Sequence, residues 1–231
     1  MSGSIITPEL RQRVRGIATP IAVGFGRLGL TPNHLTLVGF GIALVAAVAA
    51  ASQAWLAAGL LLILGAAFDL LDGALARATG KASKLGAFMD SVFDRAGEGV
   101  VYVGIVAGCL AAGFNPGAIL GAAAMAAAFM VSYVRAKSES LGFTPISRMA
   151  AIGLAPREVR IVILTIGLLG AGALGGVQSF GCGIILCADP VGGDGQPVLA
   201  VALGIITILA TITTIQRIVH VIRQDSTKEH E

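Results

Sequence analysis

The chain has 231 residues, of which 55% are hydrophobic and 13% are charged, and its formal net charge is +3. Soluble domains carry about 25% charged residues, so this composition excludes an ordinary water-soluble globule, and the high apolar content excludes a disordered chain. The 32 glycines would let helices approach closely within a bilayer. We therefore expect an all-α, polytopic membrane protein that forms a homodimer and does not bind nucleic acid.

The first predicted element is an amphipathic helix over residues 8–29, within a cytoplasmic lead-in of residues 1–33. Thr7, Pro8 and Glu9 provide a cap, a first helical residue and an acidic first turn. Apolar residues then recur at helical spacing, with Arg11 and Arg15 on another face. This pattern is typical of a helix that lies on a membrane surface.

Six apolar stretches follow, each close to the roughly 20 residues that a helix needs to cross a bilayer. They cover residues 34–52, 55–76, 86–112, 117–136, 158–180 and 197–219. We expect them to form one transmembrane domain over residues 34–223. The remaining residues, 224–231, are predicted to be a disordered cytoplasmic tail.

The basic residues predict the orientation of these spans. All 16 Lys and Arg lie before the first span, around the links between spans two and three and between spans four and five, or at the end of span six. Short loops rich in Lys and Arg stay in the cytoplasm. Both termini and both basic loops are therefore predicted to be cytoplasmic, which agrees with an even number of spans.

Four aspartates interrupt the apolar pattern near the first basic loop. Asp69 and Asp72 are three residues apart at the end of span two, and Asp90 and Asp94 are four residues apart in span three. Each pair lies on one face of its helix. Because the link between the spans is short, we expect the two helices to be antiparallel neighbours whose acidic faces meet.

Such a cluster needs compensation, because carboxylates are costly in a bilayer and repel one another. Oxygen ligands without nearby His or Cys suit Mg²⁺ or Mn²⁺, and four carboxylates can hold two such ions. Two alternatives remain open at this point. One is a structural salt-bridge cluster, and the other is the proton relay of a proton-coupled transporter.

The residues around the aspartates carry a family resemblance. The pattern D-x-x-D-G-x-x-A-R-x8-G-x3-D-x3-D is complete, and Pro32, Asn33 and Thr36 form a Pro-Asn-x-x-Thr element at the entrance to the first span. The sequence positions that match the pattern are Asp69, Asp72, Gly73, Ala76, Arg77, Gly86, Asp90 and Asp94. This pattern resembles the signature of the CDP-alcohol phosphotransferases.

The resemblance implies a membrane enzyme that transfers a phosphate-bearing group from a CDP-linked lipid to an alcohol and releases CMP. Asp69, Asp72, Asp90 and Asp94 would bind the metal ions, and Asp94 would also be the general base. The residues implied at the nucleotide are Asn33, Asp69, Gly73, Ala76, Arg77 and Gly86.

The second basic loop indicates a phosphorylated polyol as the acceptor, because clustered guanidinium and ammonium groups suit a phosphate monoester. Its candidate phosphate ligands are Ser132, Arg135, Lys137, Arg157 and Arg160. The loop is similar to the branch of the family that makes phosphatidylinositol phosphate or its archaeal ether-lipid counterpart, although Pro156 replaces the usual Glu. We therefore expect inositol 1-phosphate as acceptor, with glycerol 3-phosphate as the alternative. Cys182 and Cys187 are spaced so that a disulfide is possible but not required.

Overall fold

The structure, a computed structural model, describes residues 19–80, 82–143, 153–177 and 194–228. The predicted disulfide between Cys182 and Cys187 and residues 8–18 of the predicted surface helix lie outside the described residues. Residues 19–27 are helical, in agreement with the carboxyl-terminal part of that prediction.

The described residues contain helices and no strand, as the composition predicts. Six long helices follow this short helix. They are α2 (Pro32–Ala51), α3 (Trp55–Thr79), α4 (Lys84–Ala111), α5 (Asn115–Ser140), α7 (Arg157–Ala173) and α8 (Gly195–Lys228). Their order matches the order of the six apolar stretches.

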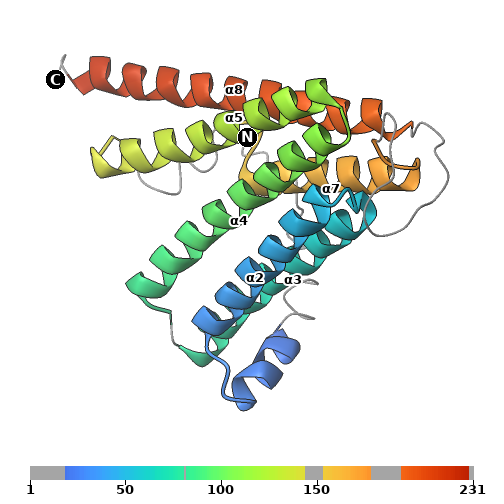
Figure 1. Ribbon diagram of the computed structural model, residues 1–231. Helices are drawn as coiled ribbons and strands as arrows, with labels where there is room; N and C mark the ends of the chain where they lie inside the picture. Colours follow the sequence, from blue (N-terminus) through green and yellow to red (C-terminus); the bar gives the residue numbers. More distant parts are fainter. Residues whose placement is uncertain (1–18, 81, 144–152, 178–193, 229–231) are drawn as a thin grey trace.

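The contacts between the six helices form a closed ring. Going round it, α2 contacts α3, α3 contacts α7, α7 contacts α8, α8 contacts α5, α5 contacts α4, and α4 returns to α2. Figure 1 shows two of these neighbouring pairs, α8 with α5 and α2 with α3. The prediction that α3 and α4 are direct neighbours is therefore wrong: each packs mainly on α2 instead. The acidic segments of α3 and α4 face each other with other helices beside them.

Two helix ends differ from their predicted positions. The helix α7 ends at Ala173 although the apolar stretch continues to residue 180, because Gly175 and Gly176 adopt positive φ angles of 85° and 86° that end the helix. The helix α8 continues to Lys228, beyond residue 223, where the ordered domain was predicted to end.

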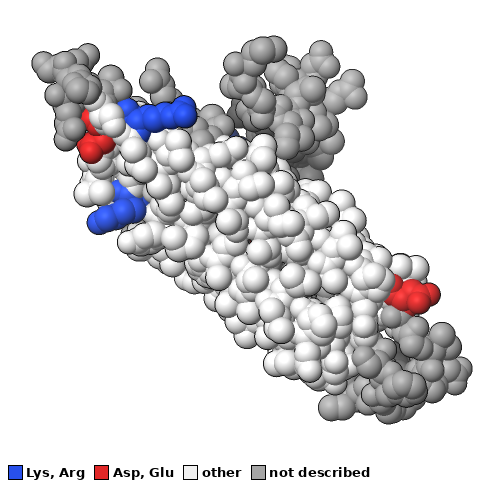
Figure 2. Space-filling view, turned by 90° about the horizontal axis from the view of Figure 1, so that it is seen from above, with Lys and Arg blue, Asp and Glu red and all other residues white. Residues whose placement is uncertain are grey.

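Four of the helices, α2, α3, α5 and α8, are long and apolar enough to cross a membrane. The helix α4 is long, but the part of it between Lys84 and Glu98 also carries Asp90, Asp94 and Arg95. The helix α7 has 17 residues. Figure 2 shows one face of the molecule, on which uncharged residues cover the middle and Lys and Arg side chains gather at one end. These features fit an integral membrane protein.

Local capping fixes the helix ends beside the aspartates. Thr31 and His34 form a capping box at the start of α2: the His34 N–H donates to Thr31 Oγ1 at 3.3 Å, and the Thr31 N–H donates to His34 Nδ1 at 3.4 Å. At the start of α4 the Gly86 N–H donates to Ser83 Oγ at 3.0 Å. Gly80, with a φ of 63°, ends α3 and lets the chain turn towards α4.

Candidate functional site

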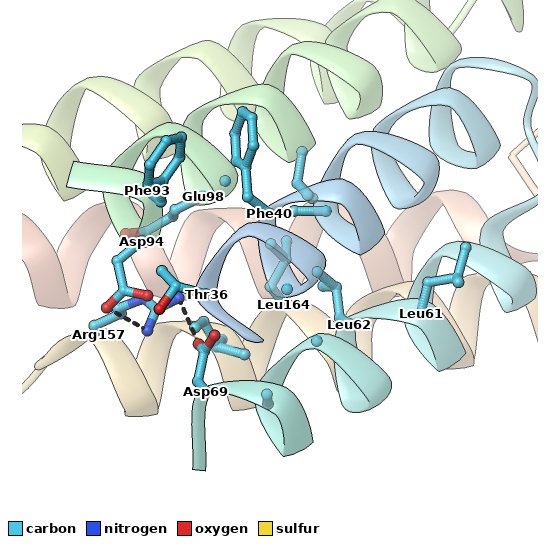
Figure 3. Close-up of a pocket in the computed structure, with 17 residues that line it drawn as sticks. Thr36, Phe40, Leu61, Leu62, Asp69, Phe93, Asp94, Glu98, Arg157 and Leu164 are labelled. Carbon is cyan, nitrogen blue, oxygen red and sulfur yellow. Dashed lines mark ion pairs between the residues drawn. The ribbon is translucent and has the colours of Figure 1, made fainter. Parts of the chain in front are cut away.

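The predicted acidic cluster is held together by an arginine from a third helix. Arg157, the first residue of α7, contacts Asp69 of α3 and Asp94 of α4 (Figure 3). Its Nη2 lies 3.0 Å from Asp69 Oδ2, and its Nη1 lies 2.7 Å from Asp94 Oδ2. The Arg157, Asp69 and Asp94 side chains are 20%, 27% and 15% exposed, so this charge bridge is largely shielded from solvent.

Asp72 is held by a different helix. The Thr36 hydroxyl of α2 donates to Asp72 Oδ2 at 2.8 Å, and both residues are buried. Thr36 is the last residue of the Pro-Asn-x-x-Thr element, so this bond gives that element a structural role. Since a buried carboxylate needs a donor, Thr36 fixes the direction in which Asp72 points.

Asp90 is half-buried, and its charge interacts with those of Asp69, Arg157 and Arg95. Within the described residues no three acidic, His or Cys side chains converge as closely as metal ligands do. The arrangement is therefore one of four nearby carboxylates, two of which share a guanidinium.

The donor set nevertheless fits divalent cations. The four candidate donors are all carboxylates, which suits Mg²⁺ or Mn²⁺. They outnumber the cations beside them: Arg157 and Arg95 both interact with Asp90 and Asp94. Arg157 also pairs with Asp69, and the charges that act on Asp72 are those of Asp90 and Asp69. Additional positive charge is favourable at such a site.

Four of the predicted nucleotide residues lie together in two pairs. Arg77 folds back over Gly73 one turn earlier, where a Cβ would lie 3.3 Å from Arg77 Nη1. Asn33 of α2 lies beside Gly86 of α4, where a Cβ would lie 3.4 Å from Asn33 Oδ1. At both places a glycine keeps space open beside a polar side chain, and Ala76 is half-buried on the same turn of α3 as Arg77.

Two cavities adjoin the cluster. The first, of about 50 Å³, lies between α2, α3, α4 and α7, and apart from its charged residues its lining includes Phe40, Leu62 and Leu164 (Figure 3). The second is larger, about 640 Å³, and lies between α4, α5, α7 and α8. Asp94 and Arg157 line both cavities. They therefore stand at the boundary between an apolar space and a charged one.

The larger cavity is rich in arginine. Five arginines line it: Arg95, Arg135, Arg157, Arg160 and Arg217. Of the predicted acceptor ligands, Ser132 and three of these arginines (Arg135, Arg157 and Arg160) are in the lining, whereas Lys137 is exposed and is not. Glu139 forms an ion pair with Arg135 at 2.9 Å.

Arg160 is largely committed to protein partners. Only 1% of its side chain is exposed, and its Nε and Nη2 each donate to Glu98 of α4 at 2.8 Å. Its Nη1 donates to the Ala155 carbonyl at 2.9 Å, and Arg95 contacts the same Glu98 at 3.3 Å. Glu98 thus joins α4 to α7 one turn beyond the contact between Asp94 and Arg157.

Sequence reasoning missed two contributors to this site. Arg217 of α8 is buried, lines the larger cavity and donates to the Val131 carbonyl at 2.6 Å. An arginine within an apolar span was itself a signal, because such residues are rare there and mark functional regions. The second is the hydrogen bond from the Thr36 hydroxyl to Asp72. Apart from the Pro-Asn-x-x-Thr element that contains Thr36, nothing in the sequence indicated this bond.

Comparison with known proteins agrees with this arrangement. The family model described as CDP-alcohol phosphatidyltransferase matches residues 29–221. The chain is 40% identical over 166 residues to the archaetidylinositol phosphate synthase of Pyrococcus horikoshii, covering 72% of this chain and 81% of the relative.

Two solved structures of Mycobacterium tuberculosis phosphatidylinositol phosphate synthase have the same fold, each at 26% sequence identity. The one with CDP-DAG bound gives a TM-score of 0.73 and covers 89% of this chain and 93% of that chain. The one in complex with manganese and citrate gives a TM-score of 0.72 and covers 88% of each chain.

Proposed function

Because the chain belongs to the CDP-alcohol phosphatidyltransferase family, we propose that it transfers a phosphatidyl-type group from a CDP-linked lipid to a hydroxyl of inositol 1-phosphate and releases CMP. The donor is CDP-diacylglycerol or an ether analogue. The names of the relatives support this reaction. The observation that carries the proposal is an arginine-rich cavity that adjoins the aspartate cluster. Asp94 lines this cavity and also the smaller apolar one.

In this reaction the acceptor oxygen attacks the phosphorus that bears the lipid alcohol. A new P–O bond forms, the P–O bond to CMP breaks, and the hydroxyl proton passes to a base. Asp94 is the proposed base, since its carboxylate faces the arginine-rich cavity and is shielded from solvent. One oxygen of Asp94, Oδ2, contacts Arg157 at 2.7 Å.

Asp69, Asp72, Asp90 and Asp94 are the proposed ligands of two Mg²⁺ or Mn²⁺ ions, which when bound neutralise charge on the pyrophosphate of the donor. A relative of known structure is in complex with manganese, which supports a divalent cation. Thr36 orients Asp72 for this purpose through its 2.8 Å hydrogen bond.

The nucleotide of the donor is proposed to lie against Asn33, Asp69, Gly73, Ala76, Arg77 and Gly86. The two glycines allow close approach to the backbone. Arg77 supplies a guanidinium for the pyrophosphate. The adjacency of Asn33 to Gly86 and of Arg77 to Gly73 supports one continuous nucleotide surface.

The acceptor phosphate is proposed to bind in the larger cavity. Its proposed ligands in the lining are Ser132, Arg135, Arg157 and Arg160, to which the position of Arg217 adds a further candidate. Lys137, the remaining predicted ligand, is exposed and lies outside the lining. Five lining arginines against Asp94, Glu139 and Glu158 leave an excess of positive charge. Such a wall favours a phosphate monoester over an uncharged acceptor.

The proposed membrane arrangement follows the charges of the sequence. The six helices α2 to α8 span the bilayer, the helix over residues 8–29 lies on the surface, and both termini and the site face the cytoplasm. The catalytic domain, predicted over residues 34–223, extends to Lys228 because α8 continues to that residue, and two copies form a homodimer. The exposed apolar side chains along α2, α3, α5 and α8 support contact with lipid.

The test is CMP release from CDP-diacylglycerol by the purified protein, with four acceptors compared: inositol 1-phosphate, glycerol 3-phosphate, inositol and serine. We expect release only with a phosphorylated acceptor, fastest with inositol 1-phosphate. It should stop with EDTA and resume with Mg²⁺ or Mn²⁺. Preference for glycerol 3-phosphate would overturn the acceptor assignment. CMP release only with the unphosphorylated acceptors, inositol or serine, would overturn the assignment of the larger cavity as a phosphate-binding site.

A further inference from the structure

We propose that Arg157 is a shared cation that alternates between Asp69 and Asp94 on one side and the phosphate of the acceptor on the other, so that metal and acceptor each strengthen the binding of the other. This inference rests on the proposed function, because it concerns how the two halves of that site communicate. In this role Arg157 differs from a fixed phosphate ligand, because the position of its side chain depends on what Asp69 and Asp94 bind.

The geometry places Arg157 at the junction of the two halves. It is the first residue of α7, and it lines both the apolar cavity and the arginine-rich cavity. Its two Nη atoms contact one oxygen each of Asp69 and Asp94, at 3.0 Å and 2.7 Å. Its Nε is buried and has no hydrogen-bond partner among the described residues, so the observed pairing leaves one N–H donor of the guanidinium without an acceptor.

A metal ion and this guanidinium have overlapping partners. Asp69 Oδ2 and Asp94 Oδ2, which Arg157 contacts, belong to two of the four carboxylates proposed to bind the ions. Once divalent cations neutralise these carboxylates, the attraction that holds Arg157 between them weakens. The side chain is then free to turn into the larger cavity, whose wall it already forms.

The other cavity arginines are less suited to this exchange. Arg160 donates to Glu98 and to the Ala155 carbonyl, and Arg217 donates to the Val131 carbonyl. Arg135 and Arg95 pair with Glu139 and Glu98, each on its own helix. Arg157 is therefore the cavity arginine whose observed carboxylate partners are proposed metal ligands, and a guanidinium binds a phosphate in a fork geometry that suits it well.

Thermodynamic linkage gives the exchange a measurable signature. If releasing Arg157 from the aspartates promotes phosphate binding, then phosphate binding must promote metal binding by the same factor. Couplings of this kind usually amount to roughly 5- to 150-fold. We expect the lower end of this range, because the guanidinium moves only between two adjoining cavities.

The experiment measures Mn²⁺ binding to the purified protein by electron paramagnetic resonance of the free ion, without any CDP-lipid. Titrations are run with and without inositol 1-phosphate, and again with glycerol 3-phosphate, after correction for Mn²⁺ bound by the phosphomonoester itself. For the unaltered protein we expect at least one phosphomonoester to lower the Kd for Mn²⁺ about fivefold or more. No change with either compound would overturn the proposal.

Arg157→Gln is the decisive variant. Without the competing guanidinium it should bind Mn²⁺ at least as tightly as the unaltered protein does, and the phosphomonoester should no longer change the Kd. Arg223→Gln, which removes the same charge from an exposed position on α8, should retain the full effect. An undiminished effect in Arg157→Gln would show that the phosphate acts on the metal directly, which overturns the proposal.

Arg157→Lys replaces Arg157→Gln in this experiment if the glutamine variant does not fold. A single ammonium lacks the fork of the guanidinium, so the phosphomonoester effect should fall to about half or less, and an unchanged effect would overturn the proposal. Failure here is distinguishable from failure of the proposed function. CMP release without coupling refutes only the shared arginine, whereas coupling without CMP release refutes only the reaction.

Discussion

Arg160 and Glu98 form a two-point ion pair inside the helix ring, with Arg160 Nε and Nη2 each 2.8 Å from a different oxygen of Glu98. One turn earlier Arg157 contacts Asp94, so two successive pairs join the start of α7 to α4. This double connection holds α7 at the distance and rotation that place Arg157 between the aspartates. The buried pair thus supports the site from the walls of its two cavities, since Glu98 lines the smaller one and Arg160 the larger one.

Loss of one partner of this pair should destabilise the protein strongly. Arg160→Met leaves the Glu98 carboxylate buried with only Arg95 beside it, and removing one member of a buried ion pair typically costs about 3–5 kcal/mol. The double variant Glu98→Leu with Arg160→Met should recover much of this loss, because an apolar pair needs no compensation. The measurement is the free energy of unfolding in detergent.

The matched control is the pair of Arg135 and Glu139, which lies at the end of α5 and is more exposed. Glu139→Gln should change the stability by no more than about 1 kcal/mol, as expected for exposed pairs. A similar loss for both pairs would contradict the assignment of the buried pair as the principal connection between α4 and α7.

Thr36→Val should reduce both the stability of the protein and its affinity for Mn²⁺. The change removes the side-chain donor to Asp72 Oδ2 and keeps the size of the side chain, so the buried carboxylate retains only its backbone partner, Gly73, at a cost of about 1–3 kcal/mol. Mn²⁺ binding should weaken with it, because Asp72 is no longer oriented. Thr211→Val is the control, since its hydroxyl donates only to the Thr207 carbonyl of its own helix. Equal effects of the two variants would argue against a role for Thr36 in orienting Asp72.

The sequence predicted where the helices lie along the chain better than it predicted which helices contact one another. Apolar length located α2, α3 and α5 closely, because each is bounded by turn residues such as Ser52 and Gly113. It did not reveal that α2 separates α3 from α4, since a short link only brings helix ends together. The closed order of the ring depends on side-chain packing between distant segments, which periodicity does not encode.

For the site, the spacing of Asp69, Asp72, Asp90 and Asp94 correctly indicated a shared acidic region. The role of Arg157 was only half anticipated. Its charge marked it as a phosphate ligand, but its contacts with Asp69 and Asp94 depend on how α7 packs over α3 and α4. Arg160 was likewise grouped with the phosphate ligands because a linear sequence does not show that Glu98 lies beside it.

Gly104→Ala tests the packing of α4 against α2. A Cβ at Gly104 would collide with the Ala47 carbonyl oxygen and would lie 2.7 Å from Ala47 Cα. Because the obstacle is backbone, the helices must separate, and we expect a loss of about 1–3 kcal/mol of stability. Gly204→Ala on α8 meets nothing within 4 Å and should be neutral or slightly stabilising. Thermal unfolding of both variants measures the difference, and similar midpoints would contradict close contact between α2 and α4.

Asp94→Asn should separate chemistry from donor binding. The amide keeps the shape of the carboxylate but accepts no proton, so the rate of CMP release should fall by about 10²–10⁴-fold, the usual contribution of a general base. The variant should still bind CDP-diacylglycerol, because the proposed nucleotide residues on α2, α3 and the start of α4 are unchanged and three of the four proposed metal ligands remain. Asp225→Asn on an exposed turn of α8 is the matched control and should retain full activity. Release by Asp94→Asn at more than about a tenth of the normal rate would exclude Asp94 as the base and leave the cluster with a purely ligating role.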